Sequence, residues 1–149
     1  MKKILAIILV LFPFVKASSE QAWILCRPDS YVICRNRADR KSDLLGYFYC
    51  GDDVETTGKT KNGYMKLTGL PLESTTGWVH TGYLVYDPPK AINKNARVTA
   101  NKVQARRMVN GKRRQWLNEG AKVFVYSMSC EWAVTNVGYV KTEFLEVMP

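Results

Sequence analysis

The chain carries nearly the same ten residues twice, and this repeat limits the possible folds more than any other feature. Residues 76–85 read TGWVHTGYLV, and residues 137–146 read VGYVKTEFLE. Aligned on Gly77 and Gly138, the two stretches share a glycine, a valine, a threonine and a leucine, and two further positions are aromatic in both. One structural unit is therefore predicted to occur twice, once in each half of the chain.

Other landmarks follow the same order in both halves. Each half has a short run that ends in arginine, then a glycine turn, a valine-centred strand and an aromatic residue. These landmarks are Arg35, Gly51, Val54 and Tyr64 in the first half and Arg106, Gly120, Val123 and Trp132 in the second. Short runs of β-branched and aromatic residues lie between them, and helical periodicity is nearly absent. The predicted fold class is all-β, with two tandem small barrels.

The individual strands and turns can be placed in the sequence. The predicted strands are ICRN, YFYC, DVETTG, YMKL and GWVHT in the first half and KVQAR, AKVFVYS, EWAVT and GYVKT in the second. The Asn-Gly pairs at 62–63 and 110–111 predict hairpins, because such turns need positive φ at both central residues. Each repeated stretch contains a segment, HTGYL or KTEFL, that fits a single turn of helix. Its glycine is expected to allow close approach of the backbone at a barrel corner.

Two adjacent prolines mark the predicted boundary between the halves. They lie at positions 88 and 89 in YDPPKAINKN and cannot donate backbone hydrogen bonds. We therefore predict a first barrel over residues 18–86, a proline-containing linker over 87–96 and a second barrel over 97–149.

Residues 1–17 have the pattern of a secretory signal peptide. MKKILAIILVLFPFVKA has two lysines, an apolar run and a small residue at the predicted cleavage site. The apolar run is shorter than the about 20 residues that span a bilayer. Loss of Lys2, Lys3 and Lys16 would change the formal net charge from +9 to +6. We expect a secreted or wall-associated, extracytoplasmic protein without a transmembrane segment after cleavage.

This order of motifs resembles the bacterial SH3-like domain, a small barrel that many bacteria export. The family's opening Leu-Asn-Val-Arg is matched by VICR at 32–35 and VQAR at 103–106. Its closing Gly-Trp-Val is matched by GWV at 77–79 and GYV at 138–140. The resemblance covers nearly all of the mature chain. Charged segments, NRADRKSD and RMVNGKRR, replace the small-residue loop that follows the arginine in the family.

The resemblance implies two tandem SH3-like barrels that form an exported, non-catalytic binding module. It implies recognition of the cell envelope, with a peptidoglycan peptide or wall polymer held in grooves lined by aromatic residues. The predicted ligand-binding residues are Tyr64, Trp78, Trp132 and Tyr139. Two linked weak sites would gain avidity on a polymeric surface. The chain is expected to be a monomer.

Two other classes of function stay open. No acidic residue lies between Asp87 and Glu119, where nine basic residues occur. They would suit an anionic polymer or, as the less favoured partner, nucleic acid; alternatively they are a solvated linker and hairpin. A protein-protein adaptor or inhibitor is the third hypothesis, with the long loop at 68–77 as its contact site. The predicted basic patch is Lys102, Arg106, Arg107, Lys112, Arg113 and Arg114.

The four cysteines are Cys26, Cys34, Cys50 and Cys130, and four cysteines allow three complete pairings. Cys34 alternates with Val32 on the inward side of a strand and is predicted to be a buried thiol. We predict a disulfide between Cys26 and Cys50 that ties the N-terminal segment to the first barrel. Cys130 would then be unpaired.

The sequence gives little support for catalysis or metal binding. His80 is the only histidine, and no two cysteines have a metal-ligand spacing. Cys34, the thiol considered as its partner, is predicted to lie inward in mid-strand, whereas a nucleophilic thiol normally lies at a helix start or in an electropositive pocket. We therefore expect no enzyme activity, no cofactor and no metal, and we place His80 in an exposed turn.

Overall fold

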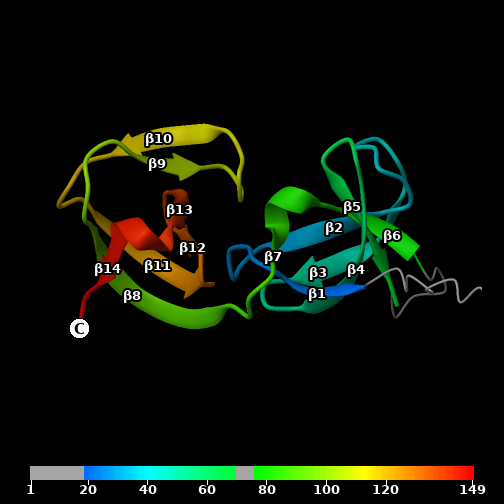
Figure 1. The fold of residues 1–149 in the computed structure, drawn as a ribbon, viewed down its shortest axis with the longest axis horizontal. Helices are drawn as coiled ribbons and strands as arrows, with labels where there is room; N and C mark the ends of the chain where they lie inside the picture. Colours follow the sequence, from blue (N-terminus) through cyan, green and yellow to red (C-terminus); the bar gives the residue numbers. More distant parts are fainter. Residues whose placement is uncertain (1–18, 70–75) are drawn as a thin grey trace, which may run out of the picture.

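The structure, a computed structural model, describes residues 19–69 and 76–149. They form two domains, each built on one seven-stranded antiparallel sheet that curves into a small barrel-like body (Figure 1). The predicted all-β fold with two tandem small barrels is confirmed. The predicted signal peptide, residues 1–17, lies outside the described residues, as does most of the 68–77 loop.

Each domain contains seven strands and one turn of 3-10 helix. The first domain consists of β1 (Glu20–Ile24), β2 (Tyr31–Arg35), β3 (Leu44–Tyr49), β4 (Asp53–Lys61), β5 (Tyr64–Thr68), β6 (Thr76–His80), η1 (Thr81–Tyr83) and β7 (Leu84–Val85). The second consists of β8 (Lys90–Val98), β9 (Val103–Arg106), β10 (Arg113–Leu117), β11 (Lys122–Met128), β12 (Trp132–Thr135), β13 (Gly138–Lys141), η2 (Thr142–Phe144) and β14 (Leu145–Val147).

The two sheets have the same topology. The strand order is β3-β2-β6-β5-β4-β1-β7 in the first and β10-β9-β13-β12-β11-β8-β14 in the second. Each strand of the first domain therefore has an equivalent in the second. The repeated ten residues form the same unit in both, a strand, a 3-10 turn and a short closing strand. The predicted single helical turns are confirmed as η1 and η2.

Every predicted strand overlaps an observed one, but the predicted linker differs from the structure. β8 begins at Lys90, so most of residues 87–96 form a strand rather than a linker. Only Ala96 and Val98 of this strand are buried. Its other residues are mainly polar, which is why the segment resembles a linker in sequence. β1, β7 and β14 were also not predicted.

One of the two predicted Asn-Gly hairpins has the expected turn. Asn62 and Gly63 have φ of 52° and 79°, as a tight hairpin between β4 and β5 requires. In the hairpin between β9 and β10, Asn110 has φ of 54° but Gly111 does not have a positive φ. The Gly111 N–H donates to the carbonyl of Met108 at 2.9 Å, so the central residues of this turn are Val109 and Asn110 and not the predicted pair. At the barrel corner, a Cβ added to Gly138 would lie 2.5 Å from the carbonyl oxygen of Arg106. Only glycine fits there.

The arginine of the opening motif holds the loop that follows it in both domains. Arg35 Nη1 donates to the carbonyl of Ser42 at 2.9 Å, and Arg106 Nη1 makes the equivalent bond, to the carbonyl of Gly111, at 2.8 Å. Each arginine pairs in register with the aromatic residue after the closing glycine, Arg35 with Trp78 and Arg106 with Tyr139. The opening and closing motifs therefore meet on adjacent strands.

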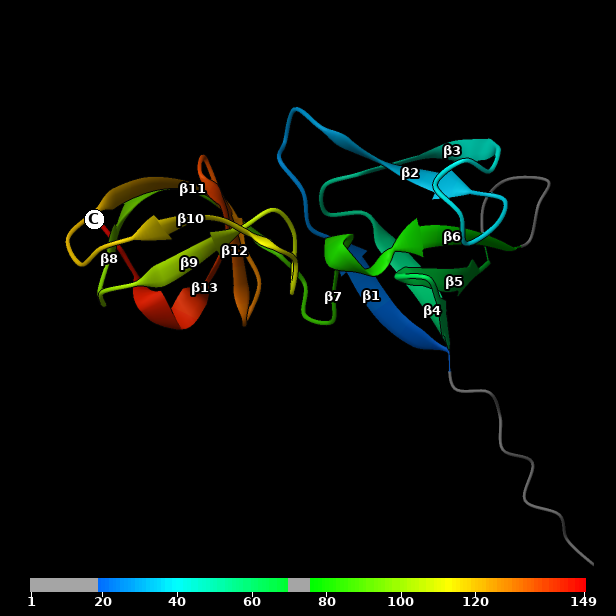
Figure 2. The same cartoon turned by 90° about the horizontal axis from the view of Figure 1, so that it is seen from above.

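Each domain has its own apolar core, and a third hydrophobic cluster joins the two domains. In Figure 2, η1, β7 and the chain after β1 face β12 and the β9–β10 loop. The domains are therefore in direct apolar contact as well as linked by the chain. The buried residues of the joining cluster are Leu25 and Val85 from the first domain and Val109, Trp132, Val134 and Tyr139 from the second.

The contact is head-to-tail, because it uses different faces of two equivalent domains. Strand register gives each first-domain contact residue an equivalent in the second domain. The equivalents are polar and exposed, so the second domain does not present the same apolar face at its free end. The residues that correspond are Leu25 with Thr99, Gly82 with Glu143, and Val85 with Glu146.

Gly82 lies in close contact with the second domain. Its carbonyl accepts the N–H of Val109 at 2.9 Å. A Cβ added to Gly82 would overlap the side chain of Met108. With Met108 packed against it, a larger side chain at position 82 would push the domains apart.

We expect Gly82→Glu, which installs the residue of the equivalent second-domain position, to separate the two domains. The new carboxylate would have to share the space of Met108 beside a buried apolar cluster. Small-angle X-ray scattering of the mature chain should show a larger radius of gyration. The reverse change at an exposed position, Glu143→Gly, is the control and should leave the scattering unchanged. An unchanged radius for Gly82→Glu would contradict a fixed interface.

Candidate ligand-binding face

β5 pairs with β6 in the first domain in the same register as β12 pairs with β13 in the second. Every second side chain on these strands points away from the domain core. In the first domain we call this surface the open face, and it consists of Tyr64, Lys66, Trp78 and His80. In the second domain we call it the covered face, and it consists of Trp132, Val134, Tyr139 and Lys141.

The first domain buries three of the four residues of the covered face, and Lys141 stays exposed. Trp132 is 2%, Val134 1% and Tyr139 6% exposed, because Leu25 and Val85 share their cluster. The Tyr139 hydroxyl donates to the carbonyl of Leu25 at 2.6 Å. Burial raises the pKa of this phenol, so it stays a neutral donor. Trp132 and Tyr139, which the sequence places in a ligand groove, instead form the domain interface.

The open face has the same strand geometry but different side chains. Tyr64, Lys66 and Trp78 are all partly exposed. Two of the predicted ligand-binding residues, Tyr64 and Trp78, therefore lie on one accessible surface. Trp78 occupies the position of Tyr139, so an indole N–H replaces a phenol O–H as the hydrogen-bond donor.

A charged loop borders the open face. Residues 36–43 join β2 to β3 and correspond to the β9–β10 loop, which contacts the first domain in the interface. The side chain of Asn62 donates to the carbonyl of Ala38 at 3.2 Å, which ties the loop to the turn before Tyr64. The loop carries three basic and two acidic residues, so its balance is positive.

His80 has a structural role on the same face. Its Nδ1 accepts the N–H of Gly82 at 3.0 Å and so caps η1. Its ring contacts those of Tyr64 and Tyr83 edge-on, with centroids 5.3 and 6.2 Å away. Burial lowers the pKa of His80, which favours the neutral ring. His80 is a partly buried cap and not the exposed turn residue expected from the sequence.

The predicted basic patch lies on and beside the β9–β10 hairpin. Lys102, Arg106 and Lys141 line a cavity of about 320 Å³, to which Glu143 adds one carboxylate. Arg113 instead places its guanidinium 4.5 Å from the centre of the Trp116 ring. The cavity contains two residues of the predicted patch and one, Lys141, that sequence spacing did not reveal. The other four residues of the predicted patch are exposed and lie outside the cavity: Arg107, Lys112, Arg113 and Arg114.

Two further cavities lie where the domains meet. One, of about 350 Å³, has Thr60 and Val85 on one side and Val109 and Trp132 on the other. The second, of about 400 Å³, lies between Cys50 and the opposing strand β11. Both are lined by residues of both domains, so they depend on the fixed interface.

Cys26 and Cys50 lie together at the end of β1. The N–H of Gly51 donates to the carbonyl of Ile24 at 2.8 Å, which continues the pairing of β1 with β4 toward the two cysteines. A hydrogen bond between the thiols lowers the pKa of Cys50 to about 6 and raises that of Cys26. Both are thiols in the structure, and their disulfide stays a prediction that this proximity permits.

The other two cysteines are also thiols. Cys34 is buried at 1% exposure, as predicted, and burial raises its pKa. Cys130 is exposed. A nucleophilic thiol has a lowered pKa, so the raised pKa of Cys34 is the opposite of what a nucleophile needs.

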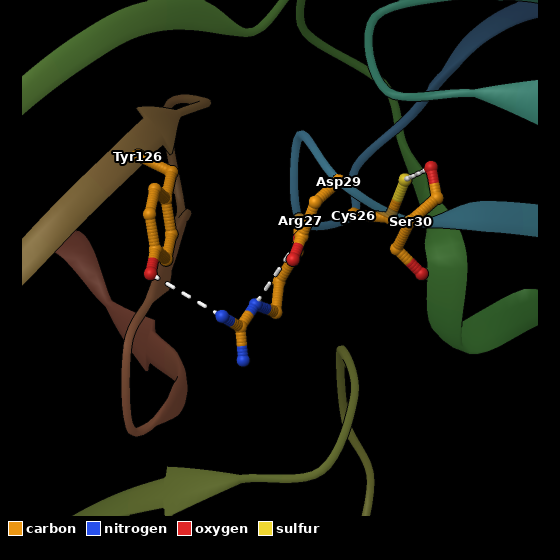
Figure 3. A network of polar contacts seen from close by, with 5 residues as sticks. All are labelled: Cys26, Arg27, Asp29, Ser30 and Tyr126. Carbon is orange, nitrogen blue, oxygen red and sulfur yellow. Dashed lines mark hydrogen bonds and ion pairs between the residues drawn. The ribbon is translucent and has the colours of Figure 1, made fainter.

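The segment after Cys26 contacts the second domain (Figure 3). Arg27 Nη2 donates to the hydroxyl of Tyr126 at 3.4 Å, and Arg27 Nε lies 3.6 Å from Asp29. Cys26 Sγ lies 4.0 Å from the carbonyl of Ser30. Cys50 Sγ lies 3.8 Å from Ser127 Oγ on β11, so both cysteines are close to the domain interface.

Two negative findings apply to residues 19–69 and 76–149 alone. That part of the chain has no helix long and apolar enough to cross a bilayer. It also has no group of three side chains placed to hold a metal ion.

We expect Cys26 and Cys50 to form a disulfide when the mature chain is made in an oxidising compartment. Peptide mapping after alkylation without reductant should find the two cysteines joined. Cys26→Ser should expose Cys50 to alkylation and lower the stability by about 3 kcal/mol. Cys130→Ser, at an exposed thiol, is the control and should change neither. Alkylation of Cys50 in the oxidised wild-type chain would contradict the pairing.

We expect the stability to fall as the pH drops below about 6.5, the ordinary pKa of histidine. The pKa of His80 is lower in the folded chain than in the unfolded chain, so protonation favours unfolding. Urea unfolding at a series of pH values should show this loss. His80→Asn keeps a side-chain cap acceptor and removes the titration, so its stability should depend less on pH across this range. Equal pH dependence in the two proteins would contradict this role.

No protein-family model matches the chain, and no curated protein matches it in sequence. Solved structures that are similar to it include two from one organism. NlpC1 from Trichomonas vaginalis has a TM-score of 0.37 and 12% identity over 87% of this chain and 46% of its own. NlpC2 from the same organism has a TM-score of 0.38 and 11% identity over 87% and 48%. The chain thus spans less than half of either structure, and at these values the likeness carries no argument about its ligand.

Proposed function

We propose that the protein is an exported, non-catalytic binding module that recognises the cell envelope through the open face of its first domain. The ligand class is a peptidoglycan peptide or wall polymer. The resemblance of both halves to SH3-like domains supports this class of ligand. Tyr64 and Trp78 supply the aromatic surface. Lys66, which pairs with Trp78 across β5 and β6, supplies a positive charge beside it.

The observation that carries this proposal is the occupation of the equivalent face in the second domain. There the first domain supplies apolar side chains and a main-chain carbonyl, which Tyr139 binds. The same strand pair in the first domain has no such partner among residues 19–69 and 76–149. The surface that binds main chain in the second domain is therefore accessible to a ligand in the first domain. The module has one such site rather than two, so avidity between two grooves within one chain is not part of the proposal.

A second candidate function is binding of an anionic polymer in the second domain. The cavity lined by Lys102, Arg106 and Lys141 favours it, because three cations and one carboxylate surround a space of about 320 Å³. Binding there would weaken steeply as salt rises. Binding on the aromatic open face would be much less sensitive to salt.

We expect Trp78→Ala to abolish binding of the mature chain to purified peptidoglycan sacculi. Loss of a central aromatic side chain at a binding surface costs about 2 kcal/mol or more, which is more than a tenfold loss of affinity. A pull-down across a salt series is the measurement. Trp116→Ala is the matched control, since Trp116 is an exposed tryptophan of the second domain. It should bind as the wild type does.

Three results would decide against the open face. Failure of the wild-type chain to pellet with sacculi at any salt concentration would remove the proposal. Normal binding by Trp78→Ala would place the site elsewhere. Binding that disappears with salt, and that is weakened by Trp116→Ala beside Arg113, would favour the basic cavity and hairpin.

A further inference from the structure

We propose that the open face also docks the free end of the second domain of another copy of this chain. Such a contact would repeat, between chains, the head-to-tail contact that joins the two domains within one chain. It goes beyond the proposed function, because it assigns a protein partner to the same face. The two occupants would exclude each other.

The first step is that the contact within the chain is heterologous. It joins the covered face of the second domain to the end of the first domain that carries Leu25 and Val85. Each chain therefore keeps one equivalent of each of these two surfaces unused. The unused faces are the open face of the first domain and the free end of the second domain. Heterologous contacts of this kind propagate into rings or filaments unless something blocks them.

The second step is that the backbone of the free end matches the docked end. In the first domain, Leu25 N–H donates to the carbonyl of Tyr83 at 2.8 Å. In the second domain, Thr99 N–H donates to the carbonyl of Phe144 at 3.0 Å. The Thr99 carbonyl is therefore presented as the Leu25 carbonyl is. Trp78, in the position of Tyr139, has an N–H that could donate to it.

The third step is charge complementarity at the positions that differ. Within the chain, Val134 and Val85 belong to one buried cluster. Between chains their equivalents are Lys66 and Glu146, an ammonium and a carboxylate. Two positions that are apolar within the chain, one on each side of the contact, thus carry opposite charges between chains.

Opposite charges also replace the contact between Gly82 and Met108. Within the chain, Met108 lies against Gly82. Between chains, Glu143 replaces Gly82 at the free end, and Arg37 replaces Met108, because each is the second residue after the arginine of the opening motif. Glu143 and Glu146 are both exposed. The free end is therefore acidic where the border of the open face is basic.

The charged residues have no competing partner in the described part of the chain. The ion pair found within residues 19–69 and 76–149 is Arg27 with Asp29, so Lys66, Glu143 and Glu146 are unpaired there. Exposed ion pairs contribute little each, and salt screens them. The contact between chains is therefore weak and dependent on salt, unlike the apolar contact within the chain. A monomer, as expected from the sequence, is the state at low concentration.

Sedimentation equilibrium of the mature chain over a range of concentrations tests this inference. At low salt the average mass should rise continuously with concentration, and high salt should restore the monomer. Lys66→Glu and Glu146→Lys should each weaken association by about fivefold or more. Lys122→Glu, at an exposed position of β11, changes the net charge as Lys66→Glu does and should associate as the wild type does.

The decisive sample is an equimolar mixture of the two charge-reversed variants. The carboxylate introduced at position 66 of one variant would face the ammonium introduced at position 146 of the other. The native Lys66 and Glu146 would meet at the next contact, so the mixture should associate again. A wild-type chain of constant mass up to its solubility limit would overturn the inference. Association that both single variants retain, or that the mixture fails to restore, would also overturn it.

Failure of this inference is distinguishable from failure of the proposed function. Glu146 lies at the far end of the chain from the open face, so Glu146→Lys should pellet with sacculi even though it no longer associates. Association without binding to sacculi would leave the second copy as the occupant of the open face and remove the wall ligand. Binding to sacculi by a chain that never associates would do the reverse.

Discussion

The packing of Leu25 and Val85 on the covered face is the contact on which the rest of the structure depends. Outward-facing residues of a small sheet normally meet water, and Trp132, Val134 and Tyr139 would form an exposed apolar patch if the domains separated. Their burial, at about 25 cal/mol per Å² of apolar surface, favours one relative placement of the domains. The hydrogen bond from the Tyr139 hydroxyl to the Leu25 carbonyl restricts the relative orientation of the two domains further. Of the two equivalent aromatic faces, the interface covers the one on the second domain and leaves the open face of the first domain accessible.

Divergence between the two copies has changed side chains at positions where the backbone is the same. Val134 and Lys66 occupy one register position, and Leu25 and Thr99 occupy another. The apolar member of each pair lies in the permanent interface, where burial outweighs the entropy of holding two domains together. The polar member lies on a surface that meets water. The same strand-pair face is therefore buried in the second domain and accessible in the first.

Local sequence rules predicted the fold class and most strands, but the site only in part. The Asn62-Gly63 turn, the corner glycine at 138 and the alternation of β2 depend on neighbouring residues, so they could be predicted without the structure. Trp132 and Trp78 look alike at that level, because both are outward aromatic residues on equivalent strand pairs. Only the placement of the first domain shows that one is covered. β8 was missed for a related reason: its backbone bonds to β11 and β14 while most of its polar side chains face water. The cap made by His80 likewise depends on a bond across the turn of η1 that its position in sequence does not reveal.

If both proposed partners use the open face, they are linked by mass action. A chain docked on a second copy hides Trp78 and Lys66, so self-association lowers the apparent affinity for the wall by the fraction of faces that are occupied. Reciprocally, a wall ligand would dissolve head-to-tail assemblies, since only the free face binds it. Salt acts on the two equilibria unequally, because the contact between chains relies on charge pairs and the aromatic surface does not. High ionic strength should therefore favour the wall-bound monomer, whereas crowding at low ionic strength should favour the assembled chain that binds no wall.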